Sequence, residues 1–269
     1  MTRQYFFLVI GFLSLLSYSQ QNDQINFYKI NYLKTFTFEH LANQKHNSNY
    51  TLNIYDDFNK SIFQKENNES NLVEKNKTKG GNPNVTFTPS GKNIGVVYKD
   101  YELQDMIYKY SNKHIMKDSM TIFGWKIIKE TKKLLGYNCQ KATMNFRGRD
   151  YIAWFTSDLP VGGPWKFDGL PGMILEIKST DDFIKFKASS INSAYLNDNL
   201  ENPFNAVNKF ITWQEYKDRY RKKAIRALSY RPTASSRGFE YSRGGIEIFI
   251  DYDDEEYNKI IKNYRKNNH

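Results

Sequence analysis

The stretch from Val161 to Ile177, VGGPWKFDGLPGMILEI, constrains the fold more than any other part of the chain. Its glycines let the backbone take conformations that residues with a Cβ avoid, and its prolines then fix their own φ angles. After the last glycine, apolar and polar residues alternate with the period of a strand that has one buried face. We therefore expect a rigid loop that leads directly into a core strand. The residues expected to shape this loop are Gly163, Pro164, Gly169, Pro171 and Gly172.

Residues 1–19 have the pattern of a secretory signal peptide. Arg3 supplies a short positive region, an apolar run extends from Phe6 to Leu16, and cleavage is expected after Ser19. The apolar run is shorter than the roughly 20 residues that a membrane-spanning helix needs. The sequence therefore predicts export across the inner membrane to the periplasm, the outer membrane or the cell surface. No transmembrane segment is expected after cleavage.

The mature chain, residues 20–269, is expected to form a single β-rich domain. A polar region near 65–83 has few apolar residues and ends in Gly80-Gly81-Asn82-Pro83, so it predicts a long mobile loop. The formal net charge is +10, but basic and acidic residues are interspersed along most of the chain. This mixture indicates a solvated surface, and no nucleic-acid partner is expected.

Short gaps between the strand-like segments after residue 121 favour an antiparallel meander. A capping box at Thr212 predicts a helix with an apolar stripe and a basic back, and a second helix is predicted from Asp253 to Lys266. The basic back of the first helix could contact an anionic membrane or glycan, although a core-facing helix with a solvated back is the more ordinary interpretation. The predicted fold class is α+β, a curved, mostly antiparallel β-sheet with helices packed on one face. Strands are predicted at Ile122–Lys129, Cys139–Phe146, Tyr151–Thr156, Met173–Ser179, Phe183–Ser189 and Ile246–Ile250.

Cys139 is the only cysteine, so the chain cannot form an intramolecular disulfide. Alternation along its strand places Cys139 on the polar face. There the free thiol could bind metal or form a mixed disulfide, or it could be a small residue covered by a neighbouring loop or helix. We favour the second interpretation.

No catalytic constellation, metal site or cofactor is predicted. The four histidines are scattered without metal-ligand spacing. Carboxylates flank the glycine-proline loop and could in principle do acid–base work, but basic residues in the same region are expected to pair with them. The carboxylates are Asp158, Asp168, Asp181 and Asp182, and the basic residues are Arg147, Arg149 and Lys166.

The segment from Thr121 to Ile177 resembles the GLPGLI family of secreted proteins from Bacteroidota. The family is named for the stretch that stands here as Gly169 to Ile174, in which Met173 replaces a leucine. The wider match includes Cys139 to Ala142, Ala153-Trp154-Phe155 and Gly163-Pro164-Trp165. The resemblance implies a signal peptide, a cell-envelope location and a β-rich fold, and it carries over no activity or catalytic residue.

Two functions of different class remain. The first is a binding or accessory protein of the envelope, in which the rigid loop shapes a groove for an apolar or aromatic-containing ligand or docks an envelope protein. The second is an envelope hydrolase acting on peptide or glycan through carboxylates near the loop. We favour binding, because the residues that hydrolysis needs are not concentrated anywhere. The residues assigned to binding are Trp154, Trp165, Phe167, Leu170 and Arg149.

Overall fold

The computed structural model describes residues 26–38, 44–66, 95–111, 114–194, 200–229 and 243–268. The signal peptide predicted at 1–19 lies outside these residues, as does nearly all of the mobile loop predicted near 65–83.

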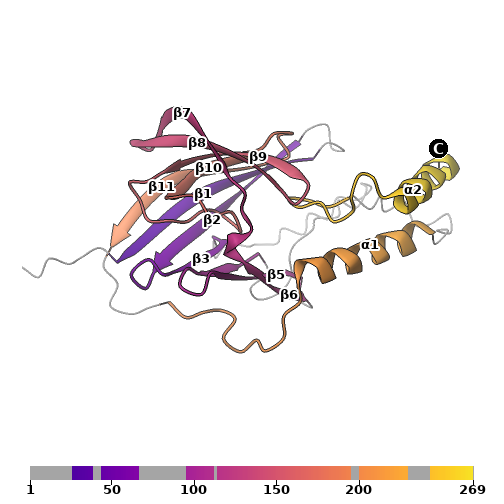
Figure 1. The fold of residues 1–269 in the computed structure, drawn as a ribbon, viewed down its shortest axis with the longest axis horizontal. Helices are drawn as coiled ribbons and strands as arrows, with labels where there is room; N and C mark the ends of the chain where they lie inside the picture. The colour runs from indigo at the N-terminus through magenta and orange to yellow at the C-terminus, as the bar shows by residue number, and fades with distance from the viewer. Residues whose placement is uncertain are drawn as a thin grey trace, which may run out of the picture.

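Eleven strands form one open sheet in which every pair of neighbouring strands is antiparallel. The order is β6-β5-β4-β3-β2-β1-β11-β10-β9-β8-β7, so two meanders run outward from a central β1–β11 seam. Figure 1 shows the sheet strongly curved, with β7 and β8 at the top and β5 and β6 at the bottom. The strands are β1 (Phe27–Phe38), β2 (Gln44–Tyr55), β3 (Lys60–Lys65), β4 (Val97–Asp100), β5 (Asp105–Ser111), β6 (His114–Ser119), β7 (Lys126–Leu134), β8 (Tyr137–Phe146), β9 (Arg149–Thr156), β10 (Met173–Ser179) and β11 (Ile184–Ala194).

The predicted α+β class is wrong, because neither α-helix in the described part of the chain covers a face of the sheet. The helices α1 (Trp213–Ser229) and α2 (Glu255–Asn268) lie side by side at one end of the molecule, next to β6 (Figure 1). The C-terminal part of the apolar stripe of α1 packs with α2, because Ala224 and Leu228 form a separate small cluster with Tyr257. Only the first turn of α1 reaches the sheet core. The fold is therefore a mostly β, open antiparallel sheet with a helical pair at its end.

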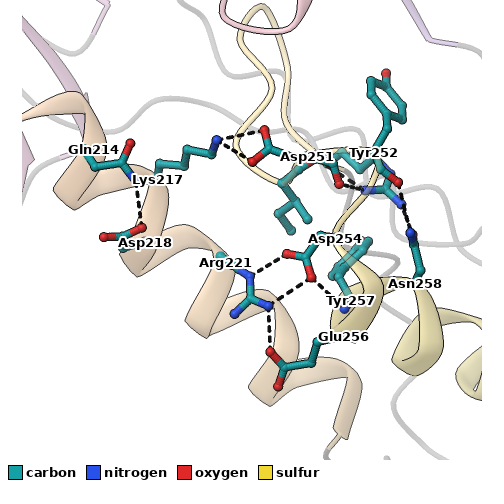
Figure 2. Close-up of polar contacts among 12 residues, drawn as sticks. Gln214, Lys217, Asp218, Arg221, Asp251, Tyr252, Asp254, Glu256, Tyr257 and Asn258 are labelled. Carbon is teal, nitrogen blue, oxygen red and sulfur yellow. Dashed lines mark hydrogen bonds and ion pairs between the residues drawn. The ribbon is translucent and has the colours of Figure 1, made fainter.

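Ion pairs fasten the two helices to each other (Figure 2). Arg221 contacts Asp254 and Glu256, and Lys217 contacts Asp251. All of these acids lie at or just before the first turn of α2, where carboxylates also complement the helix dipole. These ion pairs hold the two helices together, while the first turn of α1 also packs on the sheet.

The concave face of the sheet is filled by residues 157–172, which we call the bridging loop. Phe167 of this loop is fully buried, and its ring packs on Phe146 of β8, Tyr151 of β9 and Phe186 of β11. The hydroxyl of Tyr32 on β1 donates to the carbonyl oxygen of Ile174, just after the loop, at 2.6 Å. The loop thus contacts both meanders and takes the position in which helices were expected.

A second segment, residues 243–250, lies against the β8–β9 turn. The Ile248 amide donates to the Arg147 carbonyl at 2.9 Å, and the Tyr151 hydroxyl donates to the Ile246 carbonyl at 2.6 Å. The strand predicted at Ile246–Ile250 is wrong, because this segment makes only an isolated bridge between Gly244 and Ile248. Its backbone bonds to a turn and to a side chain instead of to a neighbouring strand.

Candidate functional site

Glycine is required where the bridging loop approaches other backbone most closely. Gly172 has φ +144°, and a Cβ at this position would lie 2.0 Å from the carbonyl oxygen of Thr156. A Cβ on Gly163 would lie 2.5 Å from the Phe167 oxygen. Such distances are shorter than any van der Waals contact, so a side chain at either position would move the backbone. Together with Pro164 and Pro171, both glycines belong to the residues predicted to shape the loop.

A buried lysine on β4 anchors the bridging loop to the sheet. Lys99 of β4 is fully buried, and its ammonium donates to the carbonyl oxygens of Gly163 and Phe167, each at 2.9 Å, and to Asp168 Oδ2 at 2.8 Å. Burial lowers the pKa of Lys99, and the Asp168 carboxylate opposes this effect. The anchor therefore satisfies a buried cation with three acceptors from one loop.

A second buried lysine, Lys166, points from the loop toward the 243–250 segment. Its ammonium forms an ion pair with Glu247 and donates to the Tyr110 hydroxyl at 2.8 Å. The same ammonium lies 4.1 Å from the ring centre of Tyr108 and 4.5 Å from that of Trp165. Burial lowers the pKa of Lys166 and raises the pKa of Glu247. The aromatic rings thus form a box that this internal cation already occupies.

Arg147 completes the charged cluster. It donates to Glu247 Oε1 at 2.5 Å and to Asp118 Oδ2 at 2.8 Å. Two cations and two carboxylates are therefore paired, and their formal charges cancel. Both cations contact the same oxygen of Glu247, whereas the other oxygen, Oε2, is buried and has no hydrogen-bond partner among the described residues. An unsatisfied buried carboxylate oxygen costs free energy unless a further group binds it.

Glu247 lines a cavity of about 220 Å³ between the β4–β5 hairpin, the bridging loop and the 243–250 segment. The cavity is smaller than the roughly 300–1,000 Å³ that drug-sized ligands occupy, so it has room for one ring-sized group at a time. Aromatic and aliphatic side chains form most of its wall. The lining residues are Gly95, Val96, Val97, Tyr108, Lys109, Tyr110, Trp165, Gly245, Ile246, Glu247 and Phe249.

The residues assigned to binding from the sequence lie in three different places. Trp165 is 9% exposed and lines the cavity, whereas Phe167 and Leu170 are buried in the sheet core. Arg149 forms an ion pair with Asp181 and donates to the carbonyl oxygen of Gly245, a lining residue, at 2.9 Å. Trp165 therefore lines the cavity itself, whereas Arg149 contacts the backbone of one lining residue.

Trp154 lies on the other face of the sheet. The Lys132 ammonium lies 4.3 Å from its ring centre, and Lys132 also bonds to Glu176 at 2.8 Å. Its neighbours Ala153 and Phe155 on β9 face the core. Because side chains alternate along a strand, Trp154 cannot reach the cavity.

Cys139 is buried and belongs to the main hydrophobic core cluster, and its register partner is Lys132 of β7. The thiol contacts the Tyr137 carbonyl oxygen at 3.8 Å, and burial raises its pKa above the ordinary value. A raised pKa reduces the thiolate fraction at neutral pH and with it the reactivity of the sulfur. Within the described residues, no group of three or more histidine, cysteine, aspartate or glutamate side chains could hold a metal ion.

Sequence reasoning did not select Glu247, Tyr108, Tyr110 or Phe249 for the site. Tyr108 and Tyr110 alternate along β5, which predicts one shared face but not what that face contacts. Glu247 stands between Ile246 and Ile248, and this alternation predicts a strand with Glu247 on its solvent-exposed face. The sequence signal at this position is that Glu247 follows two glycines, Gly244 and Gly245, in an otherwise apolar segment.

Comparison with known proteins gives one match among family models. Residues 98–218, less than half of the chain, match the model described as N-glycanase peptide, N-terminal domain. A comparison with curated proteins found no match. The family that matches is a different one from the GLPGLI family, so that resemblance stays a prediction.

Solved structures that match the chain include two crystal forms of PNGF-II. They are 21% and 19% identical to the chain with TM-scores of 0.48 and 0.45, and each alignment covers 72% of this chain and 32% of PNGF-II. A LolA superfamily protein from Nitrosomonas europaea is 10% identical with a TM-score of 0.27, covering 66% of this chain and 91% of that protein. The chain thus spans about a third of the length of the PNGF-II structures. None of the helices in the described part of the chain has the length and apolar character to cross a membrane.

Proposed function

We propose that this chain is an exported, non-catalytic glycan-binding protein whose binding site is the cavity at Glu247. The observation that carries this proposal is the buried carboxylate oxygen Oε2, which has no partner among the described residues and belongs to a residue that lines the cavity. Trp165 and Phe249 supply aromatic surface in the same wall. Aromatic surface for the C–H face of a sugar ring, together with an acceptor for its hydroxyls, suits carbohydrate recognition.

Two further observations support a glycan ligand in an exported protein. The matching family model takes its description from an N-glycanase, and the sequence resembles the secreted GLPGLI family. We propose accordingly that residues 1–19 are removed on export, that residues 20–269 act as one domain, and that the mature protein works in the periplasm or at the cell surface. An envelope protein that carries glycans would be a suitable partner.

Hydrolysis of the ligand is a weaker proposal. A glycosidase needs two carboxyl groups that flank the scissile bond, roughly 5–9.5 Å apart. Among the described residues that line the cavity, Glu247 is the only carboxylate. Its Oε1 is moreover held by Arg147 and Lys166, which leaves it poorly placed to exchange a proton. The site therefore suits binding better than catalysis.

Filling the cavity tests the proposal. Gly245 lines the cavity, and a Cβ there would meet nothing within 4 Å among the described residues, so Gly245→Phe adds a ring at the cavity wall without a clash at its Cβ. Gly124 is exposed, is equally uncrowded and does not line the cavity, so Gly124→Phe is the matched control. Glycan-array screening followed by calorimetry should find an oligosaccharide ligand for the wild type.

We expect Gly245→Phe to weaken that binding at least tenfold while its melting temperature stays close to that of the wild type. Gly124→Phe should bind as the wild type does. A folded wild-type protein that binds no oligosaccharide, or equal affinity in both variants, would contradict the proposal. Thermal melts on all three proteins separate lost binding from lost folding.

A further inference from the structure

We propose that the outward side of α1 docks this protein on a membrane surface that carries anionic lipid headgroups. This side carries four exposed cations, which we call the basic stripe: Arg219, Lys222, Lys223 and Arg226. The inference goes beyond the proposed function, because none of these residues lines the cavity at Glu247.

The basic stripe lies on one side of α1 because its spacing follows the helical repeat. Its residues stand at positions i, i+3, i+4 and i+7, which are neighbours on one helix surface. Lys222 and Arg226 are each two residues from the buried Ala224, which places them about 160° around the helix from it. The stripe extends over about 10 Å of the helix and faces away from α2.

The other cations of α1 already have acidic partners. Lys217 and Arg221 stand on the side that faces α2, and they form ion pairs with the acids at or just before its first turn (Figure 2). Within the described residues, no ion pair involves the basic stripe. The charges of the helical pair are therefore sorted, with the paired ones inside and the unpaired cations outside.

The two acids of α1 do not neutralise the basic stripe. The Glu215 carboxylate accepts from the Thr212 amide at 2.7 Å, at the start of the helix. Asp218 accepts from the side-chain amide of Gln214 at 3.0 Å. From the next residue to the end of α1 the sequence contains no acid. Four cations within about 10 Å repel one another, and a surface of opposite charge relieves this repulsion.

The shape of the basic stripe favours a membrane over a single anionic ligand. The stripe stands on a convex helix that extends beyond the end of the sheet (Figure 1), and long flexible cations in such a row fit a planar array of headgroups. Clusters of four or more basic residues on an amphipathic helix are typical of proteins that bind anionic lipids.

The docking is purely electrostatic, because the apolar stripe of α1 is already covered. Ala224 and Leu228 pack with α2, and Tyr216 stacks on Tyr110 of β5 at 4.8 Å between ring centres. No apolar side of α1 is thus left to insert between lipid chains. Binding should therefore depend on lipid charge and on salt.

Vesicle sedimentation of the mature protein tests this inference. We expect the wild type to bind vesicles of phosphatidylcholine and phosphatidylglycerol in equal amounts, and not vesicles of phosphatidylcholine alone. Raising the ionic strength from about 0.1 M to about 1 M shortens the Debye length from about 10 Å to about 3 Å, so it should release the protein.

Replacing the basic stripe with glutamine tests its position. The fourfold variant Arg219→Gln, Lys222→Gln, Lys223→Gln and Arg226→Gln loses four charges and keeps good helix formers. Its affinity for the anionic vesicles should fall at least tenfold. The matched control replaces four exposed lysines of the sheet that form no ion pair within the described residues: Lys126→Gln, Lys129→Gln, Lys133→Gln and Lys187→Gln. It loses the same net charge, and its affinity should fall by less than about threefold.

Three results would overturn the inference. Equal losses in the two fourfold variants would mean that net charge, and not α1, determines binding. Binding that persists at about 1 M salt, or that is equal on neutral vesicles, would require apolar insertion. Binding of soluble polygalacturonate without binding of anionic vesicles would assign the stripe to an acidic polysaccharide. The lipid and salt comparisons on the wild type decide the question if circular dichroism shows that the α1 variant does not fold.

Discussion

The two buried lysine–carboxylate pairs of the bridging loop use the same chemistry and differ in one respect. In the first pair every hydrogen-bonding group is used: Asp168 Oδ2 accepts from Lys99 and Tyr101, and Oδ1 accepts from the Gly169 amide. In the second pair, Glu247 has two donors on one oxygen and none on the other among the described residues. We call the first network closed and the second open, because the second leaves one buried oxygen of a cavity-lining residue without a partner among the described residues.

This difference separates a structural network from a candidate binding site. A closed network fixes the loop, because any change leaves a buried charge or carbonyl oxygen without its partner. An open network keeps a hydrogen-bonding position whose free-energy cost a ligand can recover on binding. Both networks are needed at once, because the loop that Lys99 holds is also the loop that places Lys166 and Trp165 at the cavity.

The largest effect is expected when the closed network is broken. Lys99→Met removes the cation that Asp168 and two loop carbonyl oxygens bond to, so it should lower the free energy of unfolding by about 3–5 kcal/mol. Urea denaturation followed by tryptophan fluorescence measures this loss. Lys187→Met is the control, because Lys187 is exposed on β11. A loss below about 1 kcal/mol for Lys99→Met would show that the pair does not hold the loop.

Amide substitutions compare the two carboxylates directly. In Asp168→Asn, one of the two carboxylate oxygens becomes an N–H₂ group, which cannot accept a hydrogen bond. If the N–H₂ takes the Oδ1 position, the Gly169 amide loses its acceptor; if it takes the Oδ2 position, Lys99 and Tyr101 lose theirs. Glu247→Gln can keep its carbonyl oxygen at the Oε1 position and place the N–H₂ at Oε2, where no donor is present among the described residues. Both variants lose one negative charge.

We therefore expect Asp168→Asn to be less stable than Glu247→Gln by about 1–3 kcal/mol. Chemical denaturation of the two variants under identical conditions measures the difference. Equal losses of stability in the two variants would mean that the loss of one negative charge alone determines the effect at both sites. The distinction between a closed and an open network would then have no energetic basis.

Much of the sheet could be predicted from the sequence because alternation and turn spacing are local signals. The segments at Cys139–Phe146, Tyr151–Thr156 and Met173–Ser179 are strands as predicted. The occupant of the concave face could not be predicted in this way. An apolar stripe on α1 shows that the helix buries one side, but it does not show that α2 rather than the sheet covers it.

The site was only partly predictable for a similar reason. Trp165 stood in the loop that the glycines and prolines identified, and it lines the cavity. Glu247 lies 81 residues after Lys166, and no local rule brings the two together. The alternation of Ile246, Glu247 and Ile248 indicated a solvated acid on a strand, whereas the segment is irregular and the acid is buried. Long-range pairing of charges is a property of the fold and not of sequence spacing.

A third lysine, Lys34, is partly buried and extends the comparison to a cation without a carboxylate. The Lys34 ammonium lies 5.4 to 5.9 Å from the ring centres of Phe36, Tyr50 and Phe186, and no carboxylate pairs with it within the described residues. Burial, assisted by the charge of Lys65, lowers the pKa of Lys34 to about 8. Its proton is therefore bound less tightly in the folded protein than in the unfolded chain.

Lys34→Met should consequently stabilise the protein at neutral pH. A shift from 10.5 to about 8 corresponds to at most about 3 kcal/mol, and the favourable contacts of the cation with the rings reduce the expected gain to about 1–2 kcal/mol. The unfolded chain binds more protons than the folded protein between these two pKa values, so wild-type stability should rise with pH across that window. The advantage of Lys34→Met should accordingly be constant below pH 8 and shrink toward pH 10.5. Unfolding free energies at pH 7 and pH 10, with Lys187→Met as the control, measure both quantities. A variant less stable than the wild type at pH 7 would show that the aromatic rings stabilise this partly buried cation without a paired carboxylate.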